Sequence, residues 1–181
     1  MPDTEKRREA ARKYWVPAAL WLAFAGCGSD KPVAVPAESA AARLNSSVYT
    51  GDPNAAAQLV SGFYRIEEYS WRWTTQRFSV VLRPPEGGNG EGARLVVQLG
   101  IPEPVIQRLH SISLSAMVGG SRLDPETYTR PGNYQYVRAI APKLLSEETH
   151  IDFELDKVLP PVGQDTRRLG IVVTSIALEP Q

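Results

Sequence analysis

The stretch EYSWRW, residues 68–73, holds the side chains best suited to contact a ligand. Side chains alternate between the two faces of a strand, so an extended backbone puts Tyr69, Trp71 and Trp73 on one face. Aromatic rings at this spacing can stack on the C–H face of sugar rings, which makes these residues candidates for ligand binding. The same rings can instead fill the core, where aromatic side chains bury large areas, and we expect this for at least one tryptophan.

A second candidate is the pair Asp165 and Arg167 in the sequence GQDTRRLG, residues 163–170. A carboxylate in a loop can accept hydrogen bonds from loop amides, and a guanidinium can reach a carbonyl or carboxylate of a neighbouring loop. We expect the pair to be a structural brace of the loop. Ligand recognition by Arg167 is the alternative.

Acidic side chains alternate with apolar ones in THIDFELD, residues 149–156. One face of this predicted strand carries His150, Asp152, Glu154 and Asp156. Calcium takes oxygen ligands, but residues on one strand face lie about 7 Å apart and need a second segment to complete a coordination shell. A solvated outer face explains the pattern, and we predict no metal and no cofactor.

Residues with catalytic spacing are not evident. The two histidines, His110 and His150, lie in no recognisable nucleophile setting, and the sequence contains no nucleophile elbow, phosphate-binding loop or zinc-ligand spacing. Glu67 and Glu68 point to opposite faces of a strand, so as neighbours they cannot flank one glycosidic bond. The sequence therefore predicts a protein that is not an enzyme and has no catalytic residues.

The segments that position these residues have a periodicity of two from residue 47 onward. Glycine and proline turns, among them PEGGNGEG at residues 85–92, separate the apolar segments. The predicted strands are 58–66, 70–74, 77–84, 93–100, 111–120, 134–142, 149–156 and 169–178. About eight short strands without a long helix predict an all-β fold, a single antiparallel β-sandwich of jelly-roll type over residues 47–181.

The amino-terminal residues follow the pattern of an export signal. Residues 1–15 contain five Lys and Arg residues, and residues 16–26 contain no charge. This apolar run is shorter than the roughly 20 residues that span a bilayer as a helix. Residues 28–46 are rich in Ala, Pro and Ser and predict a flexible tether.

Cys27 is the one cysteine of the chain and directly follows Ala25 and Gly26. These small residues resemble the lipobox of bacterial lipoproteins, although Phe24 stands where that family usually has leucine. The resemblance implies cleavage after residue 26 and lipidation of the Cys27 thiol, which would explain an unpaired cysteine in an exported chain. The aspartate that usually retains such proteins in the inner membrane is absent, which favours the outer membrane where one exists. An ordinary signal peptide or an uncleaved anchor is the alternative.

Charge and cysteine content exclude two classes of protein. Residues 27–181 carry 20 − 5 = 15 basic and 20 − 3 = 17 acidic side chains, so their net charge is about −2. A nucleic-acid partner is not expected at this balance. One cysteine cannot form a disulfide framework, so the hydrophobic core must stabilise the fold.

Two segments, GFYRIEEYSWRWT (62–74) and GQDTRRLGIVVTSIAL (163–178), together contain one pattern of spaced residues. These are Gly62, Tyr64, Glu67, Arg72, Trp73, Thr74, Asp165, Arg167, Leu169 and Gly170. The pattern resembles a small bacterial β-sandwich domain that accompanies glycosyltransferases and other envelope polysaccharide proteins. The resemblance covers about 120 residues, from residue 60 to the end, and implies a fold and an envelope context but no activity.

These observations together predict a non-catalytic cell-envelope lipoprotein that binds a carbohydrate or a partner in polysaccharide synthesis or export. The alternative is a structural or assembly domain that acts through protein–protein contacts, for which an exposed edge strand would suffice. A glycosidase comes third, because the fold would have to bring two carboxylates together.

Overall fold

The computed structural model describes residues 44–181, which belong to one compact unit. The predicted signal peptide (1–26), Cys27 and most of the predicted tether (28–46) lie outside the described residues. The last residues of that predicted tether already belong to the fold. The carbonyl of Asn45 accepts hydrogen bonds from the Gln58 side chain and from the Arg83 amide.

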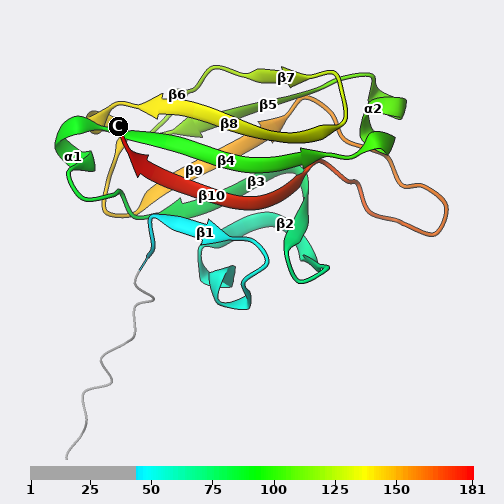
Figure 1. Ribbon diagram of the computed structural model, residues 1–181, viewed down its shortest axis with the longest axis horizontal. Coiled ribbons are helices and arrows are strands. Elements are labelled where there is room, and N and C mark those ends of the chain that lie inside the picture. The colour runs from blue at the N-terminus through cyan, green and yellow to red at the C-terminus, as the bar shows by residue number, and fades with distance from the viewer. Residues whose placement is uncertain (1–43) are drawn as a thin grey trace, which may run out of the picture. The chain divides into compact units, whose positions relative to one another are not determined.

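Strands make up most of the described chain (Figure 1). The strands are β1 (Ser47–Tyr49), β2 (Leu59–Glu67), β3 (Trp71–Leu82), β4 (Ala93–Ile101), β5 (Ile112–Val118), β6 (Ser121–Arg122), β7 (Glu126–Tyr128), β8 (Gly132–Ile140), β9 (Thr149–Leu155) and β10 (Val172–Pro180). The helices are α1 (Gly88–Glu91) and α2 (Glu103–Leu109), with 3-10 turns η1 (Pro53–Ala57) and η2 (Pro142–Leu144). Among the residues described, no helix has the length and apolar character needed to cross a membrane.

The strands form one antiparallel ten-stranded sheet in the order β6-β5-β9-β3-β10-β4-β8. Three more strands lie off this path: β7 pairs with β5, β2 pairs with β3, and β1 pairs with β10. Figure 1 shows β8, β4 and β10 lying in front of β5, β9 and β3. Strand β3 joins these layers, because it pairs with β10 at residues 72–73 and with β9 at residues 77–82. The sheet is thus curled as a half-barrel, and the predicted all-β sandwich is confirmed.

Alternating apolar side chains fill the space between the layers. Strand β5 buries every second residue from Ile112 to Val118, as its sequence predicts, and β9 does the same from Ile151 to Leu155. The rings of Phe78 and Phe153 stack across β3 and β9 with centroids 4.7 Å apart. Each such buried side chain stabilises the fold by about 1.5–3 kcal/mol relative to exposure.

Two predicted strands are one. Residues 70–74 and 77–84 were expected to be separate, but β3 runs through both. The interruption predicted between them is a bulge: residues 75–78 of β3 lie opposite Gly62 alone, because Ser61 pairs with Ser79 and Phe63 with Thr74. Bulged residues keep neither the spacing nor the pairing of a regular strand, so the alternation of apolar and polar residues is interrupted there and the sequence predicts two strands.

The remaining differences concern short elements. The predicted turn at 85–92 includes α1, and the region after β4 forms the two-turn helix α2. Strands β1, β6 and β7 have three, two and three residues, too few for an alternating pattern to be recognised.

Candidate ligand-binding site at the loop end

The prediction that Tyr69 shares a strand face with the two tryptophans is wrong. Tyr69 lies in the turn 68–70 between β2 and β3, with φ +55°, and its side chain is 97% exposed. Strand β3 begins only at Trp71, because the hairpin reverses direction over these turn residues. Alternation of faces does not extend through a turn, so the position of Tyr69 is set by the hairpin.

Trp71 and Trp73 do lie two residues apart on β3, and both are half-buried. Their ring centroids are 6.2 Å apart and the ring planes meet at 79°. Perpendicular rings cannot both stack on one flat ligand face. Trp73 packs against the hydrophobic core and also lines a surface cavity, so this one side chain contributes to both.

The second wall of this cavity is the loop between β9 and β10, which folds back on itself. Leu159 and Leu169 exchange backbone hydrogen bonds of 2.8 and 3.2 Å, and Val162 and Asp165 exchange bonds of 2.9 and 3.0 Å. Gly163 at the tip has φ +59°, a conformation that glycine adopts without steric cost. The loop is thus a small irregular hairpin that holds Asp165 in a fixed position.

Arg167 connects this loop to β2. Its guanidinium donates to Asp165 (2.8 Å from Nη2 to Oδ2) and to Glu67 (2.7 Å from Nη1 to Oε1). It also lies 5.3 Å from the centre of the Tyr64 ring, whose hydroxyl donates to the Arg168 carbonyl at 3.1 Å. The structure therefore brings Asp165 and Arg167 together and joins them to the end of the β2–β3 hairpin.

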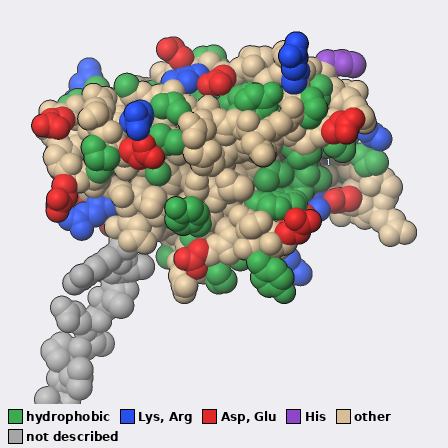
Figure 2. All heavy atoms as spheres, in the orientation of Figure 1, with side chains coloured by type: hydrophobic (Ala, Val, Ile, Leu, Met, Phe, Trp, Pro, Cys, Tyr) green, Lys and Arg blue, Asp and Glu red, His purple; other side chains and the backbone are tan. Residues whose placement is uncertain are grey.

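The cavity between these elements has a volume of about 330 Å³. Its walls are mainly apolar, with Gln107 and three charged side chains among them. The lining residues are Trp73, Pro104, Gln107, Arg108, Leu159, Pro160, Val162, Asp165, Arg167 and Leu169. Figure 2 shows hydrophobic side chains gathered in a hollow at the end of the domain where the β9–β10 loop extends, with acidic and basic side chains beside it. We call this end of the domain the loop end.

Most residues of the spaced pattern meet at the loop end. Besides the Glu67–Arg167 contact, Arg72 donates to the Tyr64 carbonyl at 3.0 Å. Thr74 and Gly170 lie so close that a β-carbon on Gly170 would stand 2.6 Å from the Thr74 hydroxyl. The two halves of the pattern are thus neighbours in space, although about 90 residues separate them in sequence.

Half of the cavity lining could not be predicted from the sequence. Pro104, Gln107 and Arg108 come from α2, and Pro160 and Val162 come from the part of the loop before Asp165. Nothing in the sequence indicates which loop α2 faces. These contacts depend on the way the sheet curls.

Asp165 and Arg167 favour each other's charged form. Hydrogen bonds from the Arg167 side chain and amide lower the pKa of Asp165 to about 2. The pKa of Arg167 is raised by hydrogen bonds to Asp165 and Glu67. Asp165 and Arg167 therefore stay charged across the physiological pH range.

We expect Asp165 to make stability depend on pH in acid. Its pKa is depressed in the folded state, so its contribution is complete above about pH 4 and is lost as the pH falls toward 2. Asp165→Asn should show lower stability at pH 6 and a smaller loss between pH 4 and 2, measured by urea unfolding at each pH. Equal losses in Asp165→Asn and the wild-type protein would contradict the contribution of this ion pair.

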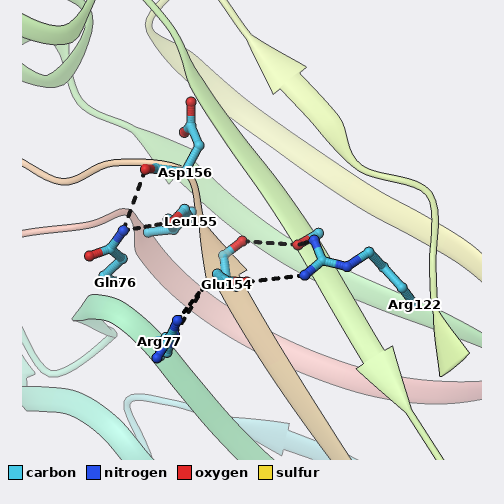
Figure 3. A network of polar contacts seen from close by, with 7 residues as sticks. Gln76, Arg77, Arg122, Glu154, Leu155 and Asp156 are labelled. Carbon is cyan, nitrogen blue, oxygen red and sulfur yellow. Dashed lines mark hydrogen bonds and ion pairs between the residues drawn. The ribbon is translucent and has the colours of Figure 1, made fainter. Parts of the chain in front are cut away.

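The acidic face of β9 does not line the cavity at the loop end, and its carboxylates contact side chains and amides of neighbouring strands (Figure 3). Glu154 accepts from Arg77 of β3 at 2.9 Å and from Arg122 of β6 at 3.2 Å, from opposite sides. Asp156 accepts from the Ser113 amide at 2.7 Å. In residues 44–181, no group of three or more His, Cys, Asp or Glu side chains is placed to hold a metal ion. These contacts join neighbouring strands across the outer face.

Comparison with known proteins does not identify the chain. It matches no protein-family model and no curated protein.

Proposed function

We propose that this protein is a non-catalytic cell-envelope lipoprotein whose β-sandwich binds a carbohydrate, as a component of envelope polysaccharide synthesis or export. The observation that supports the proposal best is the cavity at the loop end. A sugar ring has an apolar C–H face and a polar edge, and a binding site for it needs both kinds of surface.

The cavity offers these surfaces from different elements. Trp73, Pro160 and Leu169 supply apolar walls. Asp165 is an acceptor for hydroxyl groups, with its side chain 39% exposed. Arg108, for which the described part of the chain provides no ion-pair partner, is a donor on the α2 side. The Arg167 brace fixes the loop before a ligand arrives, which lowers the entropic cost of binding.

Retention of the full-length protein on purified envelope polysaccharides tests this proposal. We would use peptidoglycan sacculi, lipopolysaccharide and alginate, with heat-unfolded protein as the control. We expect the folded protein to be retained by at least one of them. Retention by none, or equal retention of the unfolded protein, would refute carbohydrate binding.

The anchoring half of the proposal rests on the sequence around Cys27 and on the tether that follows it. Lipidation would add mass to Cys27, and the accompanying cleavage would remove residues 1–26. Mass spectrometry of membrane-extracted protein should show this change, and Cys27→Ser should abolish it. A mature protein with a free Cys27 thiol would show that the lipobox resemblance is misleading.

A protein partner is the second candidate function, favoured by the exposed edge of the sheet. Strand β2 pairs only with β3 within residues 44–181, and its Val60 side chain is 52% exposed. Such an edge can pair with a strand of another chain. Sedimentation that stays monomeric at all concentrations, with no envelope protein co-purifying, would count against this function.

A further inference from the structure

The turn between β2 and β3 places a large aromatic side chain where nothing covers it. Tyr69 is 97% exposed, more than any other large hydrophobic residue in the described chain. A single exposed aromatic residue is common on protein surfaces and does not by itself indicate a function. The backbone of this turn adds a second, independent observation.

Both central residues of the turn have left-handed backbones, with φ +48° at Glu68 and +55° at Tyr69. The Ser70 amide donates to the Glu67 carbonyl at 3.1 Å and closes the turn. Two-residue turns with positive φ at both positions favour Asn-Gly or Asp-Gly, since residues with a β-carbon are strained there. The fold could make this turn at lower cost, so turn formation does not explain the tyrosine.

The surrounding structure packs closely against this strained turn. The backbone of Gly51 packs against Ser70, so closely that a β-carbon on Gly51 would stand 2.7 Å from the Ser70 Cα. Arg72 donates to the Thr50 carbonyl at 2.7 Å and fixes the same segment. Strain that is held by its surroundings is typical of positions where a side chain is presented for contact.

The turn is also connected to the cavity. Glu67, directly before the turn, accepts from Arg167, which lines the cavity. Trp71, directly after the turn, packs edge to face on Trp73, another lining residue. The residues on either side of the turn thus contact residues that line the cavity.

We propose that Tyr69 is a ligand contact and that the site is extended, so that its ligand is a polysaccharide chain and not a single sugar. This inference rests on the proposed carbohydrate binding. One sugar unit would occupy the cavity beside Trp73, and a further unit of the same chain would stack on the Tyr69 ring. Tyrosine suits this role because it offers a rigid aromatic surface and a hydroxyl with only two side-chain torsions to order.

Two variants of the full-length protein test the inference. Tyr69→Ala should weaken retention on the polysaccharide that binds wild-type protein by about fivefold or more, the effect of losing one contact worth over 1 kcal/mol. Glu68→Asn combined with Tyr69→Gly should weaken retention equally while raising the melting temperature by about 4 °C, because it relieves the turn strain. Monosaccharides from acid hydrolysis of the polysaccharide should compete poorly with the intact chain.

The outcomes separate the inference from the function on which it rests. If Trp73→Ala abolishes retention but Tyr69→Ala binds as the wild-type protein does, the cavity binds sugar and the extended site is refuted. Competition by monosaccharides as strong as by the polymer also refutes it. An unchanged or lower melting temperature of the double variant overturns the strain argument. Retention of the wild-type protein on none of the three polysaccharides overturns both proposals.

Discussion

Gly62→Ala is expected to lower the free energy of unfolding by about 2–5 kcal/mol, a large part of the 5–15 kcal/mol typical of a domain. Gly62 has φ +78°, which costs a residue with a β-carbon about 1–2 kcal/mol. A β-carbon there would also stand 2.6 Å from the Cα and Cβ of Phe78, and nearer still to the Arg77 carbonyl oxygen. Phe78 belongs to the core, so the bulge of β3 would have to move at a further cost of about 1–3 kcal/mol.

Gly120→Ala is the matched control for this prediction. Gly120 has the same φ of +78°, but no atom lies within 4 Å of the position that a β-carbon would take there. Gly120→Ala should therefore lower the free energy of unfolding only by the backbone cost of a positive φ, about 1–2 kcal/mol. Urea unfolding of both variants measures the difference. Equal losses would mean that β3 does not approach β2 at Gly62 as closely as the structure shows.

Trp73→Ala is expected to weaken ligand binding about 30-fold, the effect of losing a contact worth about 2 kcal/mol. Trp73 is the one aromatic side chain that lines the cavity, so no other ring among the lining residues can replace it. Trp73→Phe should retain part of the affinity, because a smaller ring keeps an apolar wall. Titration calorimetry with the retained polysaccharide gives the affinities, and circular dichroism shows whether each variant is folded.

Tyr49→Ala is the control for nonspecific aromatic contact. Tyr49 is 69% exposed and lines a different cavity, formed by β1, β10 and β4. It should bind as the wild-type protein does. If Tyr49→Ala and Trp73→Ala weakened binding equally, the ligand would be held by exposed aromatic residues in general and not by the loop end.

The fold class could be predicted from sequence because the long strands are buried on one face. Ile112 to Val118 and Ile151 to Leu155 alternate regularly, and their periodicity matches the observed strands. The register of β10 could not be predicted. A bulge between Val173 and Ser175 turns both Val173 and Ile176 inward, three residues apart, which no strict alternation allows.

The candidate site was predictable only in part. The sequence predicts that Asp165 accepts from loop amides and that Arg167 reaches a neighbouring loop, and Asp165 does accept from the Arg167 amide at 3.0 Å. The direct pairing of the two side chains is not part of that prediction. Glu67 is 100 residues from Arg167, and a single sequence contains no signal for such a pair. Tyr69 was misplaced because its sequence neighbours look like a strand, whereas the hairpin reverses at that point.

Tryptophan fluorescence of a fragment of residues 44–181 tests the central claim most directly, because Trp71 and Trp73 are its only tryptophans. Emission and acrylamide quenching would be recorded alone and with peptidoglycan sacculi fragments, lipopolysaccharide and alginate. Carbohydrate binding at the loop end predicts that one polysaccharide shifts the emission to shorter wavelength and protects it from quenching, and that Trp73→Ala abolishes both effects. Emission and quenching that no polysaccharide changes would contradict a sugar site at Trp73.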